Sequence, residues 1–261
     1  MTLSRIKVKA AILTLLSMMI MFPLLFTADC LASTGGAEPS GEIEYQKAAM
    51  FYSIGEAFSK AGKHKDAVEA FRNAVREKPD YEHAYNDMGA SYIELGNYGD
   101  AITALKNAIR IKPDYAAAYK NLGIAYGRAG MFKEEVSAYN EVIKLVPEDA
   151  DAHYDMGVAY GKLEMFKEAI AAYKEVIRLR PDDADTYYNL GVTCARSEMY
   201  KEAVSAYKEV IRLDPAAADA HYNLAAVYLS MGDKDSALKQ YEALKKLDPQ
   251  MAGRLLKIIK E

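Results

Sequence analysis

Apolar side chains recur along this chain with a helical period, in blocks of constant length. Within each block, apolar residues stand at positions 4, 7 and 11 of a first segment and at positions 20, 24 and 27 of a second. Spacings of three and four residues place such side chains on one face of a helix. The pattern therefore predicts pairs of amphipathic helices, each with one face buried.

Prolines mark the ends of these blocks. They recur every 34 residues, at positions 79, 113, 147, 181, 215 and 249. A proline ends a helix because it lacks the backbone N–H and clashes with the preceding turn. A fixed period of this length is typical of stacked supersecondary units. The period predicts six units: 48–81, 82–115, 116–149, 150–183, 184–217 and 218–251.

Residue size is repeated as well as hydrophobicity. Position 8 is Gly in five units, and position 20 is Ala in five, with Glu135 as the exception. Small residues allow two helix backbones to approach closely. Position 24 is large and fills the space beside that contact: Phe71, Leu105, Tyr139, Tyr173, Tyr207 and Tyr241.

These residues resemble the tetratricopeptide repeat family, with its pattern W-x2-L-G-x2-Y…A-x3-F…P over 34 residues. The resemblance covers residues 48–251. It implies an all-α fold, a right-handed superhelical solenoid of antiparallel helix pairs. Four departures should change the packing locally: His153, His221, Glu135 and Cys194. Residues 252–261 should form a capping helix that covers the end of the stack with Leu255, Leu256, Ile258 and Ile259.

The N-terminus has the pattern of an export signal. Residues 1–9 are basic, residues 10–28 are uncharged, and small residues follow. We expect a signal peptide over residues 1–32, cleaved after Ala32, and export to the periplasm or envelope. An uncleaved anchor and a lipid on Cys30 are the alternatives, since the apolar stretch nearly suffices for a membrane span and Cys30 follows it. Residues 33–47 should be a flexible linker and lead-in.

Composition and charge argue against several classes of function. The net charge is −4, and binding to nucleic acid requires a concentrated basic surface. No histidine has a second ligand at a metal-binding spacing. Cys194 occupies a position that is aromatic in the other units, so an inert, buried thiol is expected there. We predict no enzyme activity and no catalytic, cofactor-binding or metal-binding residues.

In proteins of the resembled family, first helices line a concave groove, and positions 2, 5, 6 and 9 face into it. In this chain, positions 5 and 6 carry the candidate polar residues. Tyrosines and amides alternate with charged groups at these positions. Both residue types suit peptide recognition, because Asn donates and accepts hydrogen bonds and Tyr offers contact area at low entropy cost. The candidate groove residues are Asn86, Asp87, Lys120, Asn121, Tyr154, Asp155, Tyr188, Asn189, Tyr222 and Asn223. The alternative is that these side chains only bond between neighbouring helices.

The sequence thus predicts a non-catalytic adaptor of the cell envelope that binds a peptide segment or partner domain in this groove. A pilus- or secretion-assembly factor at the outer membrane, with or without a lipid, is the second hypothesis. A regulatory subunit associated with an enzyme is the third. The expected partner is another protein, not nucleic acid, and only the N-terminal segment would contact a membrane. Self-association is also left open.

Overall fold

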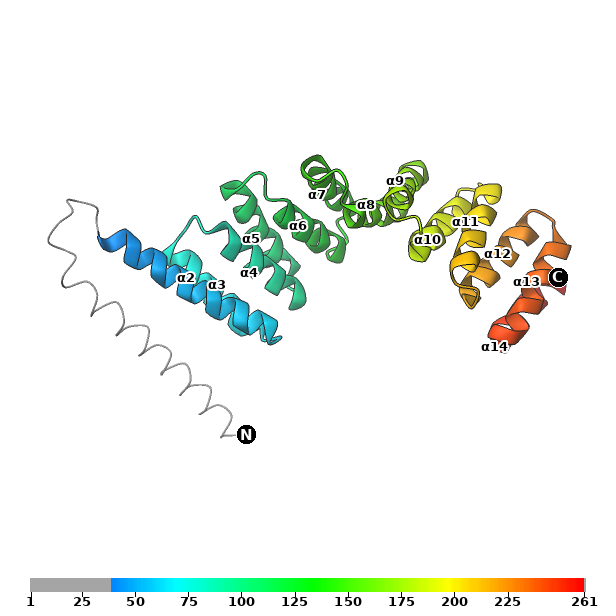
Figure 1. Ribbon diagram of the computed structural model, residues 1–261, viewed down its shortest axis with the longest axis horizontal. Helices are drawn as coiled ribbons and strands as arrows, with labels where there is room; N and C mark the ends of the chain where they lie inside the picture. Colours follow the sequence, from blue (N-terminus) through cyan, green and yellow to red (C-terminus); the bar gives the residue numbers. More distant parts are fainter. Residues whose placement is uncertain (1–38, 261) are drawn as a thin grey trace, which may run out of the picture. The chain divides into compact units, whose positions relative to one another are not determined.

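The computed structural model describes residues 39–260, which are helical apart from short turns (Figure 1). The predicted signal peptide lies outside the described residues. Within them, no helix combines the length and the hydropathy that a membrane span requires. The helices are α2 (Pro39–Lys60), α3 (His64–Glu77), α4 (Glu82–Glu94), α5 (Tyr98–Ile111), α6 (Ala116–Arg128), α7 (Phe132–Leu145), α8 (Ala150–Lys162), α9 (Phe166–Leu179), α10 (Ala184–Arg196), α11 (Tyr200–Leu213), α12 (Ala218–Ser230), α13 (Lys234–Leu247) and α14 (Pro249–Lys260).

Each 34-residue unit forms two antiparallel helices joined by a short turn. The first helices of units 2 to 6 have 13 residues, and they begin at the predicted unit starts. From Tyr45 onward the chain is one compact unit in which each helix packs against its sequence neighbours. This arrangement confirms the predicted all-α solenoid of helix pairs (Figure 1).

The two helices of a unit approach most closely where position 8 faces position 24. A methyl group at Gly123 would lie 2.8 Å from Tyr139, and one at Gly157 would lie 2.7 Å from Tyr173. Neither position therefore has room for a larger side chain unless the ring moves. The alanines at position 20 are fully buried: Ala67, Ala101, Ala169, Ala203 and Ala237. The position-24 side chains of units 1 to 5 are buried, and burying a large apolar side chain contributes about 1.5–3 kcal/mol.

In each unit, the turn after the first helix contains a residue with left-handed backbone geometry. Four units use glycine for this residue: Gly62, Gly96, Gly130 and Gly232. Glu164 and Glu198 take this place in units 4 and 5, at φ 59° and 60°, where a side chain costs about 1–2 kcal/mol. Glu164 accepts a hydrogen bond from Arg196 of the next unit at 3.1 Å, which ties the two turns together.

Both ends of the described chain differ in detail from the prediction. α14 begins at Pro249, and Leu255 and Ile259 are buried, but Ile258 is 46% exposed. Ile258 was therefore wrongly assigned to the covered end of the stack, because it lies on the solvent side of α14. At the other end, α2 begins at Pro39, so residues 39–47 of the expected linker and lead-in are helical.

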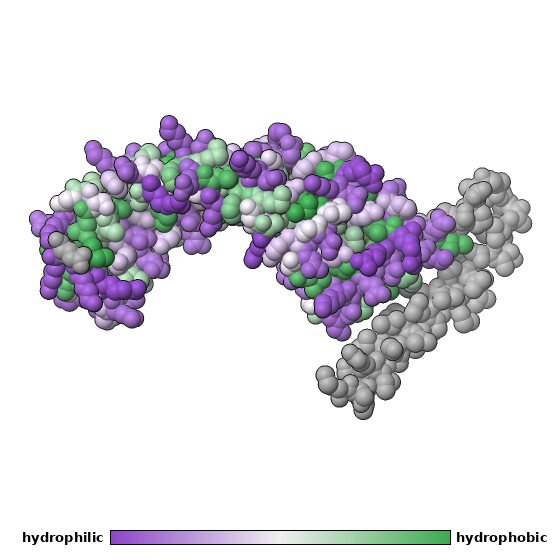
Figure 2. All heavy atoms as spheres, turned by 180° about the vertical axis from the view of Figure 1, so that it is seen from behind, coloured by the Kyte–Doolittle hydropathy of each residue, from purple (hydrophilic) through white to green (hydrophobic). Residues whose placement is uncertain are grey.

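Hydrophobic side chains on the outer surface occur in small groups. Over the face seen in Figure 2, hydrophilic side chains separate these groups from one another. Such a surface is typical of amphipathic helices that face water.

Candidate functional site

Positions 5 and 6 of the first helices are linked from one unit to the next. In four places, the position-5 side chain of one unit is hydrogen-bonded to the position-6 side chain of the following unit. The bonds are Tyr52 Oη to Asp87 Oδ2 (2.7 Å), Asn121 Nδ2 to Asn86 Oδ1 (2.9 Å), Asn189 Nδ2 to Tyr154 Oη (2.7 Å) and Asn223 Nδ2 to Tyr188 Oη (2.9 Å). Together these eight side chains form the ladder face.

Two of the four links, Tyr154–Asn189 and Tyr188–Asn223, are chemically identical. In each, the amide donates one N–H to the phenol oxygen, which leaves the hydroxyl hydrogen available to donate elsewhere. All four side chains are partly exposed. Asn189 also has a carbonyl oxygen and a second N–H with no side-chain partner among residues 39–260. The first pair therefore presents both donors and acceptors, as a peptide backbone requires.

Carboxylates give this part of the ladder face a negative potential. Burial raises the pKa of Tyr154, and the charge of Asp185 raises it further. Asp185 and Asp219 both stand at position 2 of their units and are exposed. Within the described chain, no Lys, Arg or His forms an ion pair with either of them.

The ladder is interrupted between units 3 and 4. Lys120 does not reach Asp155; it donates instead to both oxygens of Asp149 and to Asp151, each at 3.2 Å. Arg180 donates to the other oxygen of Asp151 at 2.7 Å. These bonds, first that from Arg180 and then that from Lys120, lower the pKa of Asp151. Asp149 also caps α8 by accepting from the backbone N–H of Ala152 at 3.0 Å.

Asp155 belongs to a second, more buried group at the same junction. Tyr139 Oη donates to Asp155 Oδ2 at 2.9 Å, and burial raises the pKa of Asp155. Glu135 is 8% exposed. Burial, followed by the charge of Asp155, raises its pKa to about 7. A methyl group at Gly127 would lie 2.6 Å from Glu135 Oε1, so Gly127 makes room for this carboxylate.

Two other predicted groove residues have neighbours that the prediction did not give. Asn86 is 6% exposed, because it lies between Asp87, to which it donates at 2.9 Å, and Asn121. Tyr222 packs against the hydrophobic cluster that α14 closes. Every side chain of the ladder face except Asn86 is partly exposed, and the Tyr–Asn links of units 4 to 6 are its chemically repeated part.

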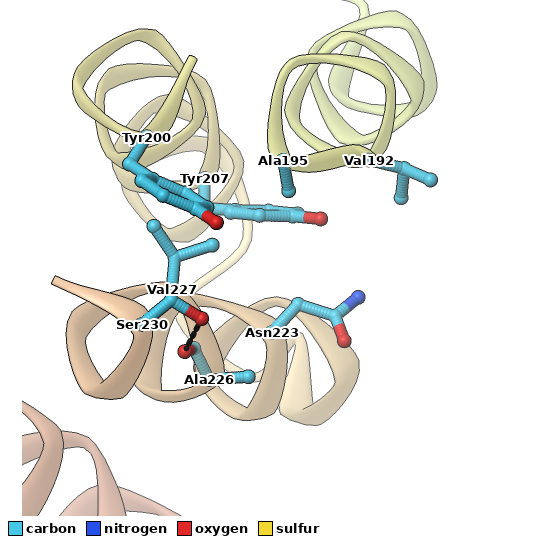
Figure 3. A pocket seen from close by; sticks show the side chains of 8 residues that line it. All are labelled: Val192, Ala195, Tyr200, Tyr207, Asn223, Ala226, Val227 and Ser230. Atoms are coloured by element: carbon cyan, nitrogen blue, oxygen red, sulfur yellow. Dashed lines mark hydrogen bonds between the residues drawn. The ribbon is translucent and has the colours of Figure 1, made fainter. Parts of the chain in front are cut away.

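A pocket that the sequence analysis missed opens beside the last link. It has a volume of about 280 Å³ and lies between α10 and α12 (Figure 3). Val192 and Ala195 line one wall, Asn223 and Ala226 line the other, and the rings of Tyr200 and Tyr207 from α11 lie between them. Positions 9 and 12 of the first helix continue the ladder by one and two turns. Position 9 was among the predicted groove positions, but its apolar residues Val192 and Ala226 gave no signal of a pocket.

The histidines and the buried cysteine have structural surroundings. His153 Nε2 lies 3.0 Å from the carbonyl oxygen of Pro147, and His221 Nδ1 lies 2.8 Å from Gln240 Oε1. Cys194 is buried, and burial raises the pKa of its thiol to about 11. In residues 39–260, no three His, Cys, Asp or Glu side chains are placed to hold a metal ion.

Solved structures of similar fold include several repeat proteins. MamA is 24% identical over 67% of this chain and 95% of its own, with a TM-score of 0.63. YrrB, described as a TPR protein with an unusual peptide-binding site, is 24% identical over 73% of this chain and 99% of its own, with a TM-score of 0.64. PilW, described as a widely conserved type IV pilus biogenesis factor, is 19% identical over 84% and 100%, with a TM-score of 0.61. At these identities the likeness shows the fold.

Family models give the same result from the sequence. A model described as TPR repeat matches residues 89–130 and 197–232. Models described as tetratricopeptide repeat match residues 150–183, 218–251 and 48–81. None of the curated protein sequences matches significantly. Because three of the matched segments coincide with predicted units, and the structure repeats the same helix pair in each, this chain belongs to the tetratricopeptide repeat family.

Proposed function

We propose that this protein is a non-catalytic scaffold that binds a peptide segment of a partner protein on its ladder face. The observation that supports this proposal best is the pair of links Tyr154–Asn189 and Tyr188–Asn223. Each link holds an amide and a phenol in a defined orientation before any partner arrives. Binding then sacrifices little side-chain entropy, which is how preorganised sites gain affinity.

Packing between units alone does not account for the chemistry of these links. A partly exposed hydrogen bond contributes only about 0.5–1.5 kcal/mol to stability, and an apolar pair at the same positions could also join two helices. The link leaves the phenol hydrogen and the Asn189 side-chain carbonyl unused, and both residues are partly exposed. The links therefore suit both purposes: they orient each other, and they offer hydrogen bonds to a peptide backbone.

We further propose that the scaffold acts outside the cytoplasm, on the strength of the N-terminal sequence. A basic segment, an uncharged stretch and small residues precede the repeats. Lipid on Cys30 would instead tether the repeats at a membrane, as the hypothesis of an outer-membrane assembly factor requires. Metabolic labelling with a palmitate analogue separates these cases. Label that is present in the wild-type protein and disappears in Cys30→Ala favours the lipid-tethered form. A wild-type protein without label favours one of the two unlipidated forms, cleaved or anchored.

Photo-crosslinking in the native host tests the binding face. A photoreactive phenylalanine analogue at Val192 lies on α10, one turn beyond the Tyr188 and Asn189 side chains. The matched control carries the same analogue at Lys208, which is exposed on the second helix of that unit. We expect a distinct partner protein to be crosslinked to position 192, and we expect the same protein not to be crosslinked to position 208.

The contribution of the links is tested in the same cells. The double variant Tyr154→Phe with Tyr188→Phe removes both phenol oxygens and leaves the rings in place. It should reduce the crosslink from position 192 while the melting temperature stays nearly constant. An unchanged crosslink, or the same partner captured from both faces, would refute binding at the ladder face.

A further inference from the structure

We propose that the bound segment carries one apolar side chain, which enters the pocket between α10 and α12, and basic side chains that face Asp185 and Asp219. This inference rests on the proposed function. The pocket and the ladder face are continuous, since Asn223 lines the pocket and donates to Tyr188 at 2.9 Å. A segment bound along the links therefore passes directly over the pocket.

The size of the pocket suits a single side chain. Its volume of about 280 Å³ is below the roughly 300–1,000 Å³ of small-molecule sites. Ser230 lies at its rim, where its hydroxyl donates to the Ala226 carbonyl at 3.1 Å (Figure 3). That hydroxyl is therefore already used, and Val192, Ala195 and Ala226 offer methyl groups. An aliphatic or aromatic side chain covers these methyl groups and the ring faces of Tyr200 and Tyr207, whereas a charged side chain would lose its water there.

Two carboxylates, one helical turn before the ladder residues on α10 and α12, determine which residues of the bound segment can flank its apolar side chain. Asp219 precedes Asn223 by one helical turn on α12, and Asp185 has the same place on α10. Asp151, their counterpart in unit 4, is already paired with Lys120 and Arg180. The carboxylates of Asp185 and Asp219 have no such partner within the described residues. Lysine or arginine in the bound segment would supply the complementary charge.

A phage-displayed library of random peptides, selected on the full-length protein, tests this chemistry. Enriched peptides are then synthesised with a fluorescent label, and their affinity is measured by anisotropy. We expect them to share one large apolar residue near lysine or arginine. The variant Ala226→Trp fills the pocket from an exposed position, and the control Ala171→Trp adds the same ring on α9, where Ala171 is also exposed.

Affinity should fall about tenfold in Ala226→Trp, as expected when one apolar side chain loses its site, and remain unchanged in Ala171→Trp. A second variant tests the charges without introducing tryptophan, so its result is independent of any effect of tryptophan on folding. Asp185→Asn with Asp219→Asn should lower affinity about threefold to tenfold and weaken its dependence on salt. The exposed Asp235→Asn on α13 is its control.

The outcomes separate this inference from the proposed function. If the peptides depend on Tyr154 and Tyr188 but not on Ala226, Asp185 or Asp219, the pocket and charge assignment is overturned and the ladder face stands. Enrichment of acidic peptides would overturn that assignment in the same way. If no peptide depends on the ladder tyrosines, both proposals are overturned.

Discussion

Replacing Glu135 with alanine should stabilise the protein above neutral pH and destabilise it slightly in acid. Glu135 stands where the other five units have a fully buried alanine. Burial, and then the charge of Asp155, raises its pKa from 4.5 to about 7. The unfolded chain therefore releases this proton near pH 4.5, and the folded chain keeps it until about pH 7.

The sign and size of the effect follow from this difference. Between pH 4.5 and 7 the folded state binds more protons than the unfolded state, so stability falls as the pH rises through this window. The full loss, about 3 kcal/mol, remains at higher pH. Alanine removes that loss, but it also removes the buried Cγ methylene, which stabilises by about 0.8 kcal/mol. The net expectation is a gain of about 2 kcal/mol at pH 8 and a loss of about 1 kcal/mol at pH 4.

Urea denaturation followed by circular dichroism measures this difference at both pH values. The matched control is Glu134→Ala, which removes the adjacent, exposed carboxylate on α7 and should change stability by less than about 0.5 kcal/mol. If Glu135→Ala alters stability equally at pH 4 and pH 8, or destabilises at pH 8, Glu135 does not retain its proton in the folded protein.

Three further predictions concern the packing. Gly123→Ala should lower stability by about 1–3 kcal/mol, since its methyl would lie 2.8 Å from the nearest ring, whereas Gly161→Ala, with open space around it, should not; thermal melting compares them. Cys194, in a chain whose other cysteine is replaced by serine, should react with a thiol reagent at pH 8 only in denaturant, because it is buried and its pKa is about 11; rapid labelling of the native protein would contradict this. Leu255→Ala should cost about 2–5 kcal/mol, and the exposed Ile258→Ala should have little effect in the same denaturation assay.

Much of the fold could be predicted because one period governs it. Five of the first helices begin at the predicted unit starts, as α8 does at Ala150. The period ends at proline, whose effect on a helix is local. The start of α2 at Pro39 was harder to predict, because the small and polar residues before Tyr45 are typical of a linker. The ring of Tyr45 lies 5.0 Å from the ammonium of Lys78. Only the packing of the folded chain brings these two distant residues together.

The candidate site was only partly predictable. Positions 5 and 6 could be selected from their residue types, but their partners lie in the next unit, and only the stacking geometry brings them together. Lys120 illustrates the limit. Each linked counterpart forms a hydrogen bond to position 6 of the next unit, yet the positive charge of Lys120 selects Asp149 and Asp151 and leaves Asp155 to Tyr139. The pocket depends on the spacing of three helices, which residue types alone do not determine.

The links of the ladder face also bear on how such a chain evolves. Each link joins position 5 of one unit to position 6 of the next, so any two neighbouring units with Tyr and Asn there can form it. A further copy of unit 5, residues 184–217, inserted after itself would find Tyr188 and Asn189 already in register with their partners. Duplication of a whole unit thus lengthens the recognition surface by one link, and no new kind of contact has to evolve. An insertion that is not a whole number of 34-residue units would break the register.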